Sequence, residues 1–357
     1  MKIRFLSTLF FFITVLILSG CGDKTDLSTF PITNNGNINI SDTLYIQQYP
    51  IWSGFNKPEA VFAGNDQLIY VADTKNNSIV QMDVAGGRYG TYYFDNSVFP
   101  KKITQDGNFD LLVICDSVTV LDTTSLVIRL KVVQGGGVLN QSMPAKRLLT
   151  SLRPTPNSNK FRRFTGISIY PDNSYIITRT GPDDPLNIDA GNAILKVKGI
   201  DSVTSLIVLN GFQTSGNSFY SIEHVSSILT IKNSSTDFII TRSTQDTLNL
   251  NKVIYFEYNF TNGTFDPMFT SANQDIVNLK FGSPDAVTFD LNSSIFVIDS
   301  YRNHLYKFSN TGKLLPESFG DSTKFSHPKG ISFFNKVVYI ADTGNDRIVR
   351  YKLSTDN

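Results

Sequence analysis

The sequence predicts an all-β fold in which six small sheets repeat around an axis, a six-bladed β-propeller. Three observations lead to this prediction. A short phrase near the N-terminus recurs near the C-terminus, weaker versions lie between the two copies, and the apolar segments have the length of strands. Recurrence of a unit within one chain is typical of an array of similar modules, and no long helical period interrupts it.

The two clear copies of the phrase are residues 70–74, Tyr-Val-Ala-Asp-Thr, and residues 339–343, Tyr-Ile-Ala-Asp-Thr. Each continues into a polar turn followed by Ile-Val, and each follows a proline-led apolar segment, at residues 58–62 and 328–333. The matching order of three segments indicates that both copies form the same supersecondary unit.

Four weaker copies lie between the clear ones, each with its own preceding apolar segment. Their phrases occupy residues 113–117, 176–180, 239–243 and 296–300. The spacing from one phrase to the next is 43 to 63 residues, which suits one small sheet per unit. A charged residue closes each of the six phrases: Asp73, Asp116, Arg179, Arg242, Asp299 and Asp342.

Each unit contains three strand-like segments. Turns such as residues 171–174 separate the first from the second, and the third alternates, as in residues 347–351. A more variable fourth strand fits between units, for example at residues 89–94 or 205–209. Four-stranded sheets repeated about an axis form a β-propeller, which leaves only short, protected sheet edges.

The two ends of the chain are expected to pair. Unit six ends soon after its third segment, near Leu353, and therefore lacks a fourth strand, while residues 44–49 form a strand-like segment ahead of unit one. We expect this N-terminal strand to complete the last blade and close the ring, because closure removes an exposed sheet edge.

The phrases resemble the NHL repeat, in which a proline- and glycine-led strand precedes Tyr-Val-Ala-Asp and then asparagine and arginine before an apolar strand. Units one and six match well, unit five matches partly, and units two to four keep the apolar skeleton. The resemblance spans residues 45–353 and implies a six-bladed propeller of the NHL or TolB-like type; seven or eight blades are the alternative.

The first 21 residues have the features of an export signal. Lys2 and Arg4 precede an apolar run to residue 18, and small residues lead to Cys21. Residues 18–21, Leu-Ser-Gly-Cys, resemble the lipobox of bacterial lipoproteins, which implies cleavage before Cys21 and lipid attachment to its thiol. An ordinary secretory signal or a membrane anchor is the alternative, although the run is short for a spanning helix of about 20 residues.

Residues 22–42 are rich in polar and small residues without apolar periodicity, which predicts a flexible tether between the anchor and a propeller over residues 43–357. Cys115 then remains as a single thiol, so no internal disulfide is expected, and we expect it to be a small buried side chain. The net charge of +1 and the export signal argue against nucleic acid as a partner.

Equivalent positions in a propeller form rings, and the phrase-closing residues form the first one. The carboxylates are expected mainly to accept hydrogen bonds from the turn that follows. Arg179 and Arg242 replace acids in adjacent units, and their guanidinium groups are candidates for holding a carboxylate or phosphate, or for pairing with Asp116 and Asp299.

A second ring of candidates opens the first strands. Its alternating charges predict either mutual ion pairs or a polar channel mouth that takes a ligand. Unit four is uncertain, between residues 224 and 226. The other members are Glu59, Lys101, Thr165, Asp285 and Lys329.

No metal site or cofactor is expected. Among relatives that the resemblance implies, an amidating lyase uses three histidines and gluconolactonase-type enzymes use carboxylates with an asparagine. The chain has three histidines, and His304 is expected away from the channel, which leaves only His224 and His327 as weak candidates. No phosphate-binding loop, nucleophile elbow or paired-cysteine signature is present.

Two insertions have a strong charge bias. Residues 134–163 contain glycines, prolines and six cationic residues without an acid, which predicts a basic loop. Such a loop is either simply solvated or a contact for an anionic partner, such as phospholipid headgroups or an acidic polysaccharide. Residues 181–189 contain three acids but not the spacing of a calcium loop, and a plain turn is expected. The cationic residues are Lys146, Arg147, Arg153, Lys160, Arg162 and Arg163.

These features predict a membrane-tethered scaffold that binds a protein, peptide or glycan in the cell envelope, on its periplasmic or cell-surface side. The alternative is an enzyme at the channel mouth, of the metal-dependent lyase or lactonase type, and a purely architectural envelope subunit is a third option. The absence of a recognisable catalytic set favours binding over catalysis.

Overall fold

The computed structural model describes residues 43–120, 122–152, 161–182, 190–244 and 251–356, and residues 43–357 form one compact unit. The predicted signal segment 1–21 and tether 22–42 lie outside the described residues. Among those described, no helix is long and apolar enough to cross a membrane.

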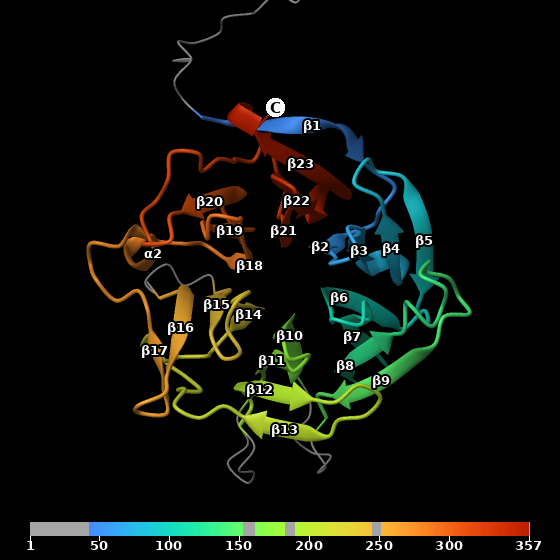
Figure 1. Cartoon of the computed structure of the whole chain (residues 1–357), viewed down its shortest axis with the longest axis horizontal. Coiled ribbons are helices and arrows are strands. Elements are labelled where there is room, and N and C mark those ends of the chain that lie inside the picture. Colours follow the sequence, from blue (N-terminus) through green and yellow to red (C-terminus); the bar gives the residue numbers. More distant parts are fainter. Residues whose placement is uncertain (1–42, 121, 153–160, 183–189, 245–250, 357) are drawn as a thin grey trace, which may run out of the picture. The chain divides into compact units, whose positions relative to one another are not determined.

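Six antiparallel sheets stand around a central axis, so the predicted six-bladed β-propeller is confirmed (Figure 1). The first strands of the blades, β2, β6, β10, β14, β18 and β21, contact one another in that order and line the axis. Blade 1 comprises β2 (Pro58–Ala63), β3 (Ile69–Asp73), β4 (Ser78–Met82) and β5 (Arg88–Tyr93); blade 2, β6 (Val98–Gln105), β7 (Leu111–Val118), β8 (Thr123–Leu130) and β9 (Ala145–Thr150); blade 3, β10 (Arg163–Ile169), β11 (Tyr175–Thr180), β12 (Ala193–Lys198) and β13 (Ser205–Val208).

Blade 5 differs from the others in having three strands among the described residues. Single bridges from Leu305 to Phe319 and from Phe308 to Leu314 cover its outer edge instead of a fourth strand.

The strands of the other half of the ring are as follows. Blade 4 comprises β14 (Val225–Thr230), β15 (Phe238–Arg242), β16 (Val253–Asn259) and β17 (Thr264–Pro267); blade 5, β18 (Pro284–Phe289), β19 (Ile295–Asp299) and β20 (His304–Phe308); blade 6, β21 (Gly330–Phe334), β22 (Val337–Asp342), β23 (Arg347–Leu353) and β1 (Tyr45–Trp52).

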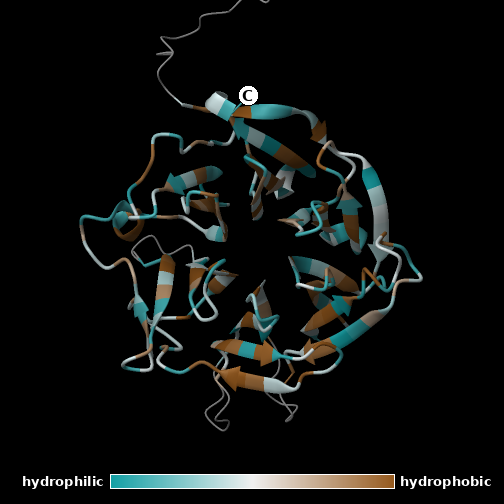
Figure 2. Cartoon of the chain, in the orientation of Figure 1, coloured by the Kyte–Doolittle hydropathy of each residue, from teal (hydrophilic) through white to brown (hydrophobic). Residues whose placement is uncertain are grey.

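The second strands read as continuous apolar runs because both of their faces are buried. In β3, Val71 packs in the core between blades 6 and 1, whereas Tyr70 and Ala72 pack in the core between blades 1 and 2. Six such cores separate the six pairs of adjacent blades. Figure 2 shows hydrophobic stretches within strands such as β16.

The predicted closure of the ring is confirmed. Strand β1 pairs antiparallel with β23, from Tyr45 opposite Leu353 to Trp52 opposite Ile348. Trp52 is 3% exposed and packs in the core between blades 6 and 1, so the N-terminal strand contributes apolar burial as well as backbone pairing.

One end of the ring gathers most of the predicted site residues. Because neighbouring strands are antiparallel, each first strand begins where the second strand of its blade ends, as with Pro58 opposite Asp73 in blade 1. We call this the first-strand end of the channel. Both predicted rings of charged residues belong to it.

Candidate functional site

A β-bulge follows the start of the first strand in five blades. In blade 1 the register shifts between Pro58 and Ala60, which leaves Glu59 as the extra residue, and the same shift recurs in blades 2 to 5. Bulges re-aim side chains and occur often beside active sites. The second predicted ring therefore consists of the bulge residues Glu59, Lys101, Thr165, Ser226 and Asp285, together with Lys329 just ahead of β21.

Glu59 is the anionic centre of one side of this bulge ring. Its Oε1 lies 2.7 Å from Nζ of Lys101 in blade 2 and 3.6 Å from Nζ of Lys329 in blade 6. Burial by itself raises the pKa of Glu59, but the two ammonium groups outweigh it and hold the pKa below its usual value. The pairing between ring members that the alternating charges predicted is therefore present on this side.

Lys102 occupies a position that holds a small residue in every other blade. The equivalent residues are Ala60, Gly166, Ser227, Ala286 and Gly330. A Cβ on Gly166 would lie 2.6 Å from the backbone nitrogen of Ile228 in the next blade, which shows how closely the inner strands approach there.

The long side chain of Lys102 instead extends across the axis. Its Nζ donates a hydrogen bond of 3.1 Å to the backbone carbonyl oxygen of Asp285 on β18, three blades away. Strands β6 and β18 lie on opposite sides of the ring (Figure 1). Burial lowers the pKa of Lys102, and the nearby acids Asp285 and Glu59 only partly counter that effect. The channel end is thus crossed by an amine that is less basic than an ordinary lysine.

Asp285 is the least satisfied member of the ring. Its Oδ2 is shielded from solvent and has no hydrogen-bond partner among the described residues. Burial raises the pKa of this carboxyl, although the nearby Ser300 hydroxyl and the charges of Lys102 and Lys329 act in the opposite direction. A buried polar atom without a partner is a point at which a ligand or a water can bind.

The phrase-closing carboxylates have structural roles. Asp73 Oδ1 accepts from the backbone nitrogen of Asn56 at 2.7 Å, and its Oδ2 accepts from the side chain of Asn76 at 2.8 Å. Asp299 and Asp342 likewise hold the segment that leads into the first strand of their blades. Asp116 is less buried and accepts from Ser125 at 2.6 Å.

The two arginines of that ring also have structural roles, as donors to backbone carbonyl oxygens of nearby connections. Arg242 is fully buried and donates to the carbonyl oxygens of Glu223, Asn251 and Gly216 and to the Ser221 hydroxyl. Arg179 donates to the carbonyl oxygens of Gly191 and Ala190. These carbonyl bonds occupy much of the guanidinium donor capacity that the sequence suggested for an anionic ligand.

His224 and His327 lie at equivalent places in the loops before β14 and β21, two blades apart. His224 Nε2 is 3.5 Å from Glu223 Oε1, and the backbone nitrogen of His327 donates to Asn303. Over the described residues, no three side chains of His, Cys, Asp or Glu come together as metal ligands. His304 starts the third strand β20, where it was expected.

The prediction that residues 134–163 form a basic loop is partly wrong. Residues 145–150 form β9, and Arg163 begins β10. The buried strand β8 needs a partner for its open edge, and β9 provides one from Leu130 opposite Ala145 to Leu126 opposite Thr150. Lys146 and Arg147 are exposed on this outer strand, whereas Arg162 is buried. Arg153, Lys160 and most of the acidic insertion, residues 183–189, lie outside the described residues.

Sequence reasoning missed Lys102 and Ser226. The available signal for Lys102 was its position directly after the bulge residue, where the other units have Ala, Gly or Ser. Ser226 was within the uncertain part of unit four, and its hydroxyl donates to the carbonyl oxygen of Pro284 in blade 5 at 2.6 Å.

Comparisons with known proteins support the fold. No protein-family model matches the chain, and no curated protein matches it. A Bacteroides thetaiotaomicron protein of unknown function is 11% identical with a TM-score of 0.58, over 88% of this chain and 76% of that one. The PQQ-bound aldose sugar dehydrogenase of Streptomyces coelicolor is 13% identical with a TM-score of 0.54, over 88% and 99% of the two chains.

A third similar structure is virginiamycin B lyase from Staphylococcus aureus, which is 10% identical with a TM-score of 0.52, over 87% of this chain and 99% of the lyase. At these identities the comparisons establish the architecture alone, and the six-bladed propeller that the repeats predicted agrees with it.

Proposed function

We propose that the chain is a membrane-tethered binding protein, in which an NHL- or TolB-like propeller presents the first-strand end of its channel to a protein, peptide or glycan of the cell envelope. One observation carries the proposal. Charged side chains from four blades converge at that end, and one buried carboxyl oxygen has no partner there. Convergent polar groups with perturbed pKa values are typical of ligand sites.

The tether in this proposal is the lipid on Cys21, with residues 22–42 as the spacer and the propeller on the periplasmic or cell-surface side. The export-signal composition and the Leu-Ser-Gly-Cys sequence support it. A protein held in this way acts on partners within reach of the membrane, with no nucleic acid involved.

The charge balance at the channel end favours an anionic group on the ligand. Lys101, Lys102 and Lys329 outnumber the two acids Glu59 and Asp285 by one formal charge. A carboxylate of a peptide or of an acidic glycan can accept hydrogen bonds from the lysines, while a neighbouring donor group can bond Asp285 Oδ2.

The experiment measures binding of two named probes, a trigalacturonate and a peptide Ala-Glu-Glu-Ala, to the intact chain by calorimetry. We expect at least one probe to bind, and Lys102→Ala and Lys329→Ala to weaken binding about tenfold each, as loss of a charge-assisted hydrogen bond predicts. The control is Lys313→Ala, which removes an exposed lysine at the outer side of blade 5.

Failure of both probes to bind would contradict an anion site at the channel end. Equal weakening by Lys313→Ala would do the same, because the effect would then come from the overall charge of the protein. Raising the salt concentration should weaken binding of the anionic probes, since part of the attraction is between exposed charges.

An enzyme at the same channel end is the second candidate. The specific observation in its favour is that Lys102 Nζ contacts the residue Asp285, and that burial raises the pKa of Asp285 and lowers that of Lys102. Both shifts are toward neutral pH, the direction that favours proton transfer. Hydrolysis of glucono-δ-lactone that is lost in Asp285→Asn but kept in Asp95→Asn would support this candidate. Equal rates in both variants would count against it.

A further inference from the structure

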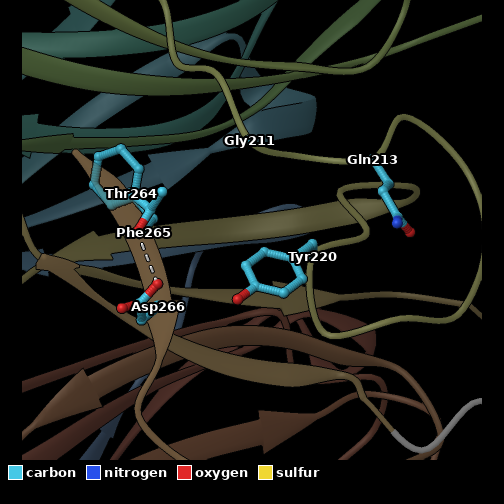
Figure 3. A pocket seen from close by; sticks show the side chains of 6 residues that line it. All are labelled: Gly211, Gln213, Tyr220, Thr264, Phe265 and Asp266. Atoms are coloured by element: carbon cyan, nitrogen blue, oxygen red, sulfur yellow. Dashed lines mark hydrogen bonds between the residues drawn. The ribbon is translucent and has the colours of Figure 1, made fainter. Parts of the chain in front are cut away.

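A second concave site lies on the outer wall of the propeller, away from the channel. It is a hollow of about 290 Å³ between the segment that joins blades 3 and 4 and the outermost strand of blade 4 (Figure 3). This volume is near the lower end of the range of about 300–1,000 Å³ for small-molecule pockets. The lining residues are Gly211, Gln213, Tyr220, Thr264, Phe265 and Asp266.

Both walls of the hollow are held by backbone hydrogen bonds. The nitrogen of Gln213 donates to the carbonyl oxygen of Tyr220, and the nitrogen of Ile222 donates back to Gln213, each at 2.9 Å. On the other wall β17 pairs with β16, with Asp266 opposite Glu257. The hollow is therefore preformed, which limits the conformational entropy that a ligand must remove.

An aromatic cluster forms the base. Phe265 lies 5.6 Å from Phe212 and 5.2 Å from Phe238, and Tyr220 lies 6.4 Å from Phe256, measured between ring centroids. Rings that contact one another on several sides have little freedom to move. Tyr220 and Phe265 thus offer fixed apolar surface to a flat ligand face.

Two neutral polar side chains and one carboxylate surround this aromatic surface. Gln213 Oε1 accepts a hydrogen bond from the Ser218 hydroxyl at 2.6 Å. The side-chain NH2 group of Gln213 supplies donors on this wall of the hollow. The Tyr220 hydroxyl points toward Asp266 across the hollow (Figure 3). Asp266 accepts one bond on each oxygen, from Thr264 at 3.0 Å and Asn259 at 2.9 Å, so each oxygen keeps further acceptor capacity.

We propose that this hollow binds one neutral sugar unit of a glycan. A pyranose has apolar C–H faces for Tyr220 and Phe265, and hydroxyl groups around its rim that both donate and accept. Asp266 is the one charged residue among the six that line the hollow, and its carboxylate disfavours phosphate or acidic sugars. The site does not depend on the channel, and an anionic ligand at the channel end is a separate proposal.

The test titrates maltotriose, cellotriose, mannotriose and chitotriose into the intact chain, followed by saturation-transfer NMR and calorimetry. At least one trisaccharide should bind, Tyr220→Ala should weaken it at least tenfold, and Asp266→Asn should weaken it less. Tyr220→Phe separates the two roles of the tyrosine, because it keeps the ring and removes the hydroxyl. The matched control is Tyr89→Ala, at an exposed tyrosine on β5 of blade 1.

Two results would overturn the proposal. One is no binding of any of the four trisaccharides at millimolar concentration. The other is equal weakening by Tyr220→Ala and Tyr89→Ala, because the effect would then not come from the hollow. A third result would also count against a sugar site: tighter binding of butylammonium than of every sugar, because the hollow would then select a cation through Asp266. Lys102→Ala should leave sugar binding unchanged, so failure of the channel proposal is distinguishable from failure of this one.

Discussion

Nζ of Lys102 on β6 lies 3.1 Å from the backbone carbonyl oxygen of Asp285 on β18, on the opposite side of a ring of six blades. The hydrogen bond joins blades that share no sheet or core. Every other blade has Ala, Gly or Ser where blade 2 has Lys102, so the crossing is a property of this one residue. A ligand acid at the channel end would compete for the same amine.

The ionisation of Asp285 should make folding stability depend on pH. Burial raises the pKa of Asp285 in the folded state above the ordinary 3.8. At pH values between 3.8 and this raised pKa, the folded state therefore holds more protons than the unfolded state. Stability from this group is therefore present at low pH and decreases as the pH rises through the folded pKa. Asp285→Asn removes that decrease, and we expect the variant to gain stability relative to the parent as the pH increases above about 4.

Urea unfolding of the parent and of Asp285→Asn at pH 3.5 and pH 7 measures this difference. The control is Asp95→Asn, whose side chain is exposed and for which the change in unfolding free energy should stay within about 0.5 kcal/mol. A difference between parent and Asp285→Asn that is the same at both pH values would contradict the assigned burial of the carboxyl.

Arg242 should be required for stability rather than for ligand binding. Arg242→Ala removes four hydrogen bonds, one of them the buried bond to the Ser221 hydroxyl, and takes this donor away from three carbonyl oxygens at partly buried positions. We expect a loss of about 3 kcal/mol or more in unfolding free energy, from the usual 1–3 kcal/mol for each buried group left unsatisfied. Arg302→Ala, at an exposed arginine in blade 5, is the control and should change stability by about 0.5 kcal/mol at most. Similar unfolding curves for the two variants would argue for a binding role at Arg242.

The architecture could be predicted from the sequence because the repeat carries it. Residues 70–74 and 339–343 contain Asp73 and Asp342, whose carboxylates both hold the segment before the first strand of their blade. Where the repeat weakens, the prediction lost accuracy. Strand β9 was assigned to a loop, because its six residues follow a glycine-rich stretch and lack apolar alternation. Its pairing is imposed by the open edge of β8, which is a tertiary effect.

The site was only partly predictable for a related reason. Charge at the bulge positions, such as Glu59 and Lys101, was visible because those positions recur in each unit. The contact between Lys102 and Asp285 could not be predicted from the sequence, because it joins residues that are 183 positions apart and lie across the axis from each other. The hollow beside Tyr220 could not be predicted for the same reason, because its walls come from the connection between blades 3 and 4 and from strand β17, and none of its residues belongs to the repeated phrase.

Strand β1 should be needed for a closed, monomeric ring. A chain that starts at residue 53 lacks β1 and the single tryptophan, Trp52, and exposes the full edge of β23. We expect a lower urea midpoint and concentration-dependent association, because an unpaired strand edge is a template for another chain. The matched control starts at Thr43 and keeps β1. If light scattering and unfolding midpoints agree for the two truncated chains, then β1 contributes little to closure.

Cys21 should determine where the protein is found in the cell. In a bacterial host, the parent should incorporate labelled palmitate and sediment with membranes, because two or more acyl chains give stable anchoring where one chain does not. Cys21→Ser removes the thiol that carries the lipid, and we expect it to lose the label. Cys115→Ala is the matched control, since Cys115 is fully buried in β7 and inaccessible to a modifying enzyme. It should keep both label and membrane association. If Cys21→Ser retained the label, or if the parent carried none, lipid attachment at this cysteine would be excluded, and an uncleaved signal segment would be the remaining route to the membrane.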